Sequence, residues 1–496
     1  MKILVTTGRL AQTTVEAAVQ DNADVLVLDI DIAAFITPGL LRSSLPDGRY
    51  DLILVPGLVS SDFTDLEDEF GLLIRLGPRH AYDLTSVLSC AGELELSKTI
   101  PADEFLSKKL RKDALLHINE HERDATPAFE ICGRKIGGSS VMKVMAEIAG
   151  ATGMSEEKLV EKIREFEEKG ADIIDIGATM DASIDDVIKS VIITKSTTKL
   201  PVSIDTLNPD LIVAGIQSGV DLVLSLNSGN IDAVKDVVLE HGTAVVIIPD
   251  QGDHDSLHRN IEYAKDLGIE KIVADPVLDP VGHGVVESIY RYGDFRKKDG
   301  TTPLFFGVGN VTELIDADSV GVNALLTGIG AELGADILFT PEHSDKARGS
   351  IAELVTAAQM MVLAKERSSS PKDLGIDLLI LKEKRYLPDA EIPEESVLAK
   401  QKSEWAPDPA GCLRIEISRA HETIIVTHRQ ATIVGTDVCR IITTAIDLGL
   451  ISQMDHAGYL GRELTKAKIA LDLGWNYVQD EPFEKSSPGS PGLAKQ

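Results

Sequence analysis

The sequence predicts an α/β protein with a central (β/α)8 TIM-type barrel between two smaller α/β domains, and three observations lead to this fold class. A glycine, one further residue and an acid precede an apolar run at four places, so one supersecondary unit repeats along the chain. Four more apolar runs alternate with these, which gives eight strands within roughly 200 residues. The length of 496 residues also exceeds what one hydrophobic core usually organises.

The predicted strands alternate with amphipathic segments, and eight such strands match a barrel better than an open sheet. In chain order the strands are "VMKVMAEI" from 141, "GADIIDIG" from 170, "PVSID" from 201, "GVDLVLSLN" from 219, "TAVVIIP" from 243, "GIEKIVADP" from 268, "PLFFGVG" from 303 and "GADILFT" from 334. Before the second strand, Ser155 can cap a helix that Gly170 ends in a left-handed turn. Asn208 and Pro209 similarly fit the N-cap and first position of a helix after the third strand.

The barrel is expected over residues 126–367, with separate segments on both sides. Residues 1–125 predict an α/β domain, and because no glycine-rich phosphate loop follows its first strand, a scaffold or interface role is favoured. A proline-rich, charged linker is expected at 368–409, a small α/β domain at 410–484 and a disordered tail at 485–496.

The composition excludes several classes of partner. A formal net charge of −30 argues against nucleic acid and anionic membranes, which need a concentrated basic face. No apolar run is long enough to predict a membrane span, and the N-terminus lacks the features of a signal peptide, so a cytoplasmic location is expected. Four scattered cysteines suggest neither a zinc site nor a disulfide framework.

Almost every predicted barrel strand ends in a polar residue. The C-terminal ends of the strands form the active face of such barrels, so these side chains predict a ligand site there. The residues are Glu147, Asp175, Asp205, Asn227, Asp250, Asp275 and Asn310.

Two of these carboxylates are suited to bind a ring that presents two neighbouring hydrogen-bond donors. Asp205 and Asp275 each follow an apolar strand, and a carboxylate beside apolar walls accepts well from adjacent N–H and NH₂ groups, as in a 2-amino-4-oxo pyrimidine ring. Asn227 adds a group that both donates and accepts. The set suits a pterin, although each aspartate could instead cap the helix that follows it.

Residues 130–365 resemble the pterin-binding barrels, which comprise dihydropteroate synthases and methyltetrahydrofolate-corrinoid methyltransferases, and the whole chain resembles archaeal dihydropteroate synthase-related proteins. The motifs are "GADIIDIG", "VSIDT", "SLNSGN", "VADP" and "GVGNVTE". The resemblance implies that Asp205, Asn227 and Asp275 hold the pterin, with Ser225 as an alternative for the asparagine. From their places at the strand ends, we also expect Glu147 to contact the substrate. We expect Asp175 to orient Asp205 or a bound water.

The chain departs from the synthases at two turns. It reads "GVGNVTE" where they have a Ser-Arg-Lys turn, and "FTPEHSDKARG" where they have an Arg-Val-His motif. Lys346 and Arg348 are the candidates to replace the missing anion-binding groups, although a solvated helix start explains them almost as well. The first turn resembles that of the corrinoid methyltransferases, which implies a catalytic role for Asn310.

The resemblance implies a transferase that joins a hydroxymethylpterin diphosphate to an arylamine in folate- or tetrahydromethanopterin-type one-carbon metabolism. Asp175, Asp205 and Asn310 are the expected catalytic residues. Mg²⁺ would shield the departing diphosphate, but no residues are assigned to a metal. A methyltransferase acting on a corrinoid protein and a non-catalytic pterin scaffold are the alternatives. Such barrels often form homodimers, yet no segment marks an interface.

Overall fold

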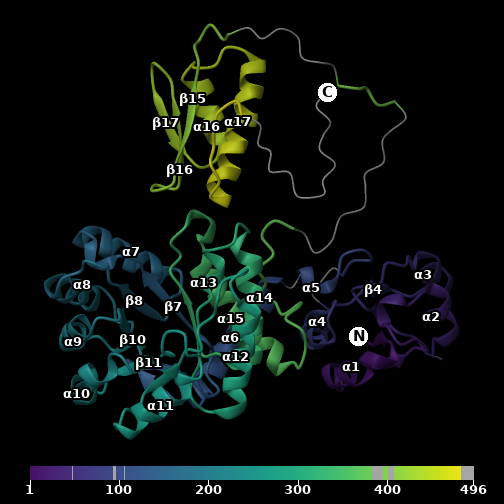
Figure 1. Ribbon diagram of the computed structural model, residues 1–496. Coiled ribbons are helices and arrows are strands. Elements are labelled where there is room, and N and C mark those ends of the chain that lie inside the picture. Colours follow the sequence, from purple (N-terminus) through teal and green to yellow (C-terminus); the bar gives the residue numbers. More distant parts are fainter. Residues whose placement is uncertain (47, 93–95, 106, 383–394, 400–406, 482–496) are drawn as a thin grey trace. The chain divides into compact units, whose positions relative to one another are not determined.

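The computed structural model describes residues 1–46, 48–92, 96–105, 107–382, 395–399 and 407–481 (Figure 1). It divides into two compact units, Met1–Tyr386 and Leu387–Gln496. The tail expected at 485–496 and part of the linker expected at 368–409 lie outside the described residues. Among the described residues, no helix is both long and apolar enough to cross a membrane.

All eight predicted barrel strands are confirmed, and all are parallel. Their order in the sheet is β12-β11-β10-β9-β8-β7-β14-β13, and an isolated parallel bridge between Ala274 and Leu304 brings the two outer strands together. The sheet therefore nearly closes into a barrel. The strands are β7 (Lys143–Ile148), β8 (Ile173–Gly177), β9 (Val202–Asp205), β10 (Leu222–Leu226), β11 (Ala244–Ile247), β12 (Ile272–Ala274), β13 (Phe305–Phe306) and β14 (Ile337–Thr340).

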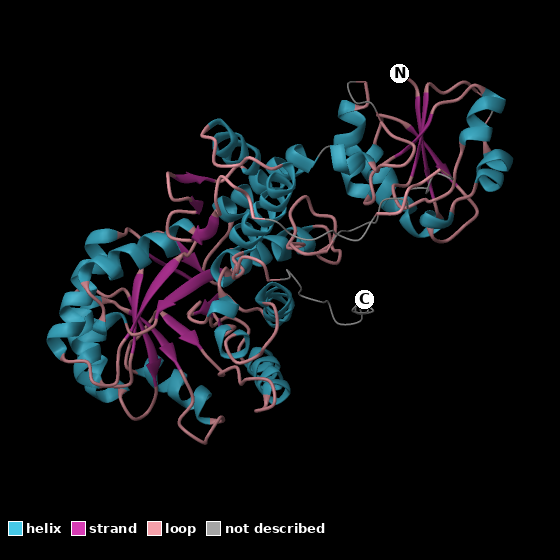
Figure 2. Cartoon of the chain, turned by 90° about the horizontal axis from the view of Figure 1, so that it is seen from above, coloured by secondary structure: helices cyan, strands magenta, loops and turns pink. Residues whose placement is uncertain are grey.

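Helices surround these strands, as Figure 2 shows. They are α7 (Glu156–Glu168), α8 (Ile184–Thr197), α9 (Pro209–Gln217), α10 (Ile231–His241), α11 (Ser256–Asp266), α12 (Val285–Lys298), α13 (Gly309–Thr312), α14 (Ser319–Leu333) and α15 (Ser350–Glu366). The predicted helix starts and ends are confirmed. Ser155 caps α7, Asn208 caps α9 with Pro209 at its first position, and Gly170 has a left-handed φ of +92°.

The alternation of side chains along each strand separates two apolar layers. Outward-facing residues such as Val144, Ile174 and Val202 pack against the helices. Inward-facing residues such as Met145 and Ile173 fill the barrel, together with side chains of a hairpin that precedes it. That hairpin, β5 (Phe129–Ile131) and β6 (Arg134–Ile136), was not predicted, because charged residues interrupt both of its strands and no apolar run marks them.

The N-terminal segment forms a parallel four-stranded sheet of order β2-β1-β3-β4, with an apolar cluster on each face. Three of its strands were predicted, and the three-residue β4 was missed. The elements are β1 (Ile3–Thr7), α1 (Gln12–Val19), β2 (Asp24–Val27), α2 (Pro38–Ser44), β3 (Leu52–Val55), α3 (Thr64–Phe70), β4 (Ile74–Leu76) and α4 (Leu84–Cys90). Helices α5 (Ala102–Phe105) and α6 (Ser107–Asp124) follow in the chain.

The second unit contains an antiparallel sheet, β15 (Arg414–Ser418), β16 (Thr423–Thr427) and β17 (Thr432–Gly435), and helices α16 (Val438–Asp447) and α17 (Met454–Leu473). The first two strands and both helices were predicted. The polar side chains of α17 bond within this unit: Glu463 is fully buried and accepts from Lys466 Nζ at 2.9 Å, and His456 contacts Asp408 at 2.8 Å. These groups stabilise the unit itself.

Candidate active site at the C-terminal ends of the barrel strands

Three carboxylates from consecutive strands meet at the C-terminal end of the barrel. Glu147 lies opposite Asp175 in the register of β7 and β8, and Asp205 ends β9. One carboxylate oxygen of each lies within 4.8 Å of the others. Burial raises the pKa of Asp205. Burial and the charges of Asp205 and Glu313 raise the pKa of Glu147 to about 7, and burial with the two neighbouring carboxylates raises that of Asp175 well above its ordinary value.

Strand β8 ends in a glycine, Gly177, because a larger residue would not fit beside the Glu147 carboxylate. A Cβ atom there would lie 2.4 Å from Glu147 Oε1 and 3.1 Å from the carbonyl oxygen of Ile148. The absence of a side chain at Gly177 therefore leaves the space beside β8 that the Glu147 carboxylate occupies. The strand carries a carboxylate at Asp175 and then breaks at Gly177 because both residues serve one cluster.

Asp175 is hydrogen-bonded to a serine of the neighbouring strand. Its Oδ1 accepts a hydrogen bond of 2.5 Å from Ser203 Oγ on β9, whereas the hydroxyl that orients Asp205 is that of Ser225, at 3.0 Å from Oδ1. The resemblance leaves open whether Asn227 or Ser225 holds a pterin, and in the structure Ser225 contacts Asp205. Asn227 Oδ1 instead accepts from the Gly229 N–H at 2.9 Å, in the turn before α10.

Ser225 reaches Asp205 through an irregularity in the sheet. The pairing of β10 with β11 shifts register between Val223 and Leu226, and Ser225 has a φ of +68°. Bulges and left-handed residues of this kind re-aim side chains and concentrate at functional sites. No period in the sequence signals such a shift, so this orientation could not be predicted.

Asp275, just after β12, is held through one of its two oxygens. Its Oδ1 accepts from the Val277 N–H and from the Tyr292 hydroxyl, both at 2.8 Å, while no described residue hydrogen-bonds its Oδ2. Burial raises the pKa of Asp275 to about 6, against the lowering effect of those two hydrogen bonds. The carboxylate is thus fixed in orientation and keeps one acceptor free.

Val277 has a strained backbone at this point. Its φ is +68°, a left-handed conformation that is costly for a β-branched residue. The strain places its N–H on Asp275, and glycine would adopt the same conformation at lower cost.

We expect Val277→Gly to raise the free energy of unfolding by about 0.5 to 1 kcal/mol, because relief of about 1 to 2 kcal/mol of strain outweighs the entropy that glycine adds to the unfolded chain. Denaturant unfolding measures this. Val286→Gly, at an exposed position of α12, is the matched control and should lower the same quantity by about 1 kcal/mol. A loss of stability in both variants would contradict the strain.

Asn310 lies in the turn after β13, at the start of α13. Its Nδ2 donates to the Leu278 carbonyl oxygen at 3.0 Å, and Gly307 makes room for it, since a Cβ there would lie 2.8 Å from that nitrogen. This bond connects the turns after β12 and β13. The Oδ1 of Asn310 accepts no hydrogen bond from a described residue.

The two candidate anion-binding groups lie after β14. Lys346 Nζ forms an ion pair of 2.8 Å with Asp316, whose side chain is 98% exposed. Arg348 is exposed. A solvent-exposed pair of this kind is weak, so Lys346 can exchange its partner for an anion at small cost.

Asp250, the remaining strand-end residue, takes a structural role. Its Oδ1 accepts from the Ser228 N–H and from Asn260 Nδ2, both at 3.1 Å, so its carboxylate connects the loops around β11. Sequence reasoning missed Tyr292 and Ser203, which hydrogen-bond to Asp275 and Asp175. Ser203, two residues before Asp205, is the one that strand alternation could have identified as inward-facing.

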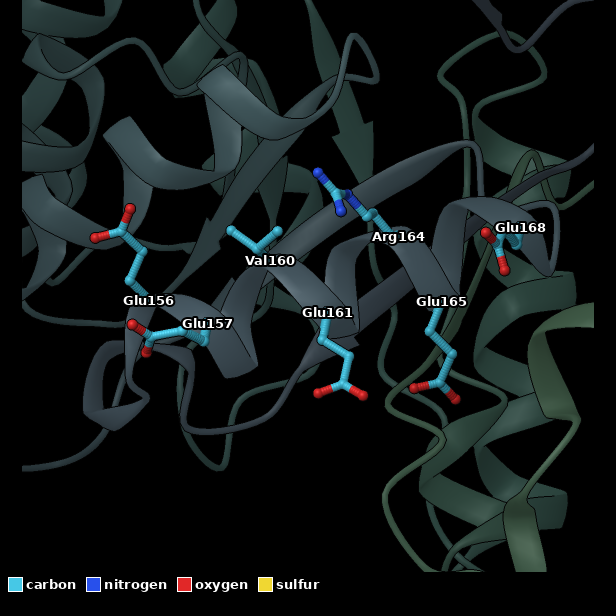
Figure 3. Close-up of a pocket in the computed structure, with 7 residues that line it drawn as sticks. All are labelled: Glu156, Glu157, Val160, Glu161, Arg164, Glu165 and Glu168. Carbon is cyan, nitrogen blue, oxygen red and sulfur yellow. The ribbon is translucent and has the colours of Figure 1, made fainter. Parts of the chain in front are cut away.

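A separate surface depression lies along α7 and is lined by that helix alone (Figure 3). Its charged side chains point in different directions in Figure 3, and Glu165 is already paired with Lys162 and Lys169. The lining is acidic and does not converge on a common point. It shows the features of a solvated helix face rather than of a ligand site.

Comparisons with known proteins match two parts of this chain. Residues 148–280, which contain Asp175, Asp205 and Asp275, match the family described as "Pterin binding enzyme". Residues 407–480, in the second unit, match the family described as "PterinBD-DUF4346".

A relative from Methanocaldococcus jannaschii, "Uncharacterized protein MJ0107", is 39% identical over 519 residues, which span 97% of this chain and 98% of the relative. Among solved structures, a Yersinia pestis dihydropteroate synthase in complex with a sulfonamide drug has 17% identity and a TM-score of 0.40, with 49% of this chain and 99% of its own covered. A Xanthomonas albilineans dihydropteroate synthase has 22% identity and a TM-score of 0.39, with 47% of this chain and 96% of its own covered. The chain belongs to the same family as its Methanocaldococcus jannaschii relative, and residues 148–280 within its barrel match the pterin-binding enzyme family.

Proposed function

We propose that the protein joins a hydroxymethylpterin diphosphate to an arylamine, as a dihydropteroate synthase-like transferase of tetrahydromethanopterin-type cofactor biosynthesis. Membership of the pterin-binding enzyme family supports the pterin. The archaeal source of the relative supports the type of cofactor. The arylamine is the acceptor that the named synthases among the structural neighbours suggest.

One observation carries the pterin assignment: Asp275 is held by Oδ1 and keeps Oδ2 free. A pterin presents a ring N–H and a 2-amino group side by side, and a carboxylate accepts from both with two parallel hydrogen bonds. Tyr292 and Val277 fix the plane of the carboxylate before the ligand arrives. Asp205, oriented by Ser225, adds a second acceptor at the same end of the barrel.

In the proposed reaction the protein stabilises developing charge and forms no covalent intermediate with the substrate. As the C–O bond to the diphosphate breaks, the leaving group takes the electron pair and positive charge develops on the exocyclic carbon and the ring. The carboxylates of Asp205 and Asp275 stabilise that charge. The arylamine nitrogen then forms the C–N bond and releases its proton to water. Mg²⁺, when bound, would neutralise charge on the leaving diphosphate.

Competition by pyrophosphate tests this assignment. In calorimetric titrations with a hydroxymethylpterin diphosphate, millimolar pyrophosphate should compete, because both need the anion site that we assign to Lys346 and Arg348. The double variant Lys346→Ala with Arg348→Ala should lose the competition and still bind free hydroxymethylpterin. Lys158→Ala with Arg164→Ala, two exposed positions on α7, removes the same charges elsewhere and should leave the competition intact. Unchanged binding of the diphosphate in the presence of pyrophosphate would exclude the synthase.

Methyl transfer from a methylated pterin to a corrinoid protein is the second candidate, and Asn310 favours it. This side chain is anchored by Nδ2 and has a free Oδ1, which could accept from a reduced pterin ring. If this function holds, Asn310→Ala abolishes turnover with a methylated pterin and a corrinoid acceptor, and pyrophosphate has no effect. If neither reaction turns over while pterin binds, the chain is a pterin-binding scaffold.

A further inference from the structure

The carboxylates of Glu147, Asp175 and Asp205 have a feature that pterin binding leaves unexplained. They approach within 4.8 Å of one another although like charges at that distance repel each other strongly in a buried site. The fold does not merely tolerate this approach: Gly177 provides the space for Glu147 Oε1, and the register of β7 and β8 sets Glu147 directly beside Asp175.

Asp175 supplies an independent sign of a missing partner. Its side chain is 0% exposed, and its buried Oδ2 atom has no hydrogen-bond partner in the described part of the chain, while Oδ1 is bonded to Ser203. An unsatisfied buried carboxylate oxygen costs on the order of 1 to 3 kcal/mol or more. Native proteins rarely leave such a group without a ligand, water or ion.

The charge balance of the cluster points the same way. Among the described residues, no lysine, arginine or histidine forms an ion pair with any of the three carboxylates. Of the side chains that the structure describes, only the hydroxyl groups of Ser203 and Ser225 donate to them. Buried carboxylates of this kind must either bind protons or share a cation.

We propose that Glu147, Asp175 and Asp205 bind one divalent cation with a preference for hard oxygen ligands, Mg²⁺ or Mn²⁺. The donor set consists of carboxylate oxygens alone, which these ions prefer over the nitrogen and sulfur ligands of zinc. Three protein ligands leave other coordination positions to water or to a substrate oxygen, as is usual for Mg²⁺. The bound ion would satisfy Asp175 Oδ2 and keep all three groups ionised.

Binding of Mn²⁺ alone tests the site without pterin or turnover. Protein freed of metal with a chelator is titrated with MnCl₂ at 150 mM salt, about the ionic strength at which weak surface binding is screened, and free Mn²⁺ is followed by electron paramagnetic resonance. We expect one saturable ion per chain. Asp175→Asn and Glu147→Gln keep the size of each side chain and should weaken binding at least about 10- to 100-fold, since even the loss of an outer-shell partner has that effect.

Asp236→Asn, at an exposed position of α10, removes one charge elsewhere and should leave the affinity unchanged. Thermal unfolding gives the second readout: Mn²⁺ should raise the Tm of the parent and of Asp236→Asn, but not of the two cluster variants. If Asp175→Asn does not fold, Glu147→Gln still decides. Equal Mn²⁺ affinity in all four proteins, or no saturable site in the parent, overturns the proposal. The cluster would then be stabilised by bound protons instead of a cation. Because no pyrophosphate or pterin is present, this outcome is independent of the proposed reaction.

Discussion

Asp275→Asn should weaken pterin binding by about 2 to 4 kcal/mol, or about 30- to 700-fold, because it replaces a charged acceptor of two N–H groups by a neutral amide. The amide oxygen can still accept from Tyr292 and Val277 at the position of Oδ1, so the fold should be kept. Calorimetry with hydroxymethylpterin measures the affinity. Asp266→Asn, at the exposed end of α11, is the charge-matched control and should bind as the parent does.

The pH dependence of pterin affinity provides a second test of the role of Asp275. Burial raises the pKa of Asp275 to about 6, and only the ionised form accepts two hydrogen bonds from the pterin. Affinity should therefore be level above about pH 6 and fall by about tenfold per pH unit below it, in the parent but not in Asp275→Asn. Binding that is equally tight in both proteins, or equally pH-dependent in both, would assign the pterin to another group.

Gly177→Ala should have the second large effect. The added methyl group would lie 2.4 Å from Glu147 Oε1 and 3.2 Å from Ala149 Cα, in a fully buried strand between β7 and β9. Overpacking of this kind costs about 1 to 3 kcal/mol, and it also displaces the Glu147 carboxylate from the cluster. We expect a lower free energy of unfolding in denaturant and a loss of Mn²⁺ binding.

The control for this variant is Gly328→Ala. Gly328 lies within α14, where a Cβ would have only an ordinary contact of 3.9 Å with Met361 Sδ. Alanine there should be neutral or stabilise by up to about 1 kcal/mol, because it is the better helix former. If Gly177→Ala were as stable as the parent and bound Mn²⁺ equally well, Glu147 could not occupy the position between the strands that the structure gives it.

The sequence was sufficient for the barrel because its signals are local and repeated. Left-handed glycines after helices α7, α9, α10, α11 and α14, caps such as Ser155 and Asn208, and short apolar runs between the helices all agree on one supersecondary unit. The strands that were missed, β4, β5, β6 and β17, lack a clear apolar run: β4, β5 and β6 each contain at least one charged residue among three, and β17 has only two apolar residues besides its glycine.

The site could be predicted only in part. Strand ends identify the rim, so Asp205 and Asp275 were named, but which oxygen is held and which is free depends on Tyr292, which lies 17 residues beyond Asp275. The left-handed backbone at Ser225 and Val277 likewise reflects tertiary constraint. The proximity of the three carboxylates required the strand register, which no single segment of sequence encodes.

A crystal structure of the protein soaked with hydroxymethylpterin and pyrophosphate would test the central claim most directly. We predict the pterin at the C-terminal end of the barrel, with its ring N–H and 2-amino group donating to Asp275 and Oδ2 engaged in one of the two bonds. Pyrophosphate should lie beside Lys346 and Arg348. A pterin bound away from Asp275, with that Oδ2 still free, would contradict the account.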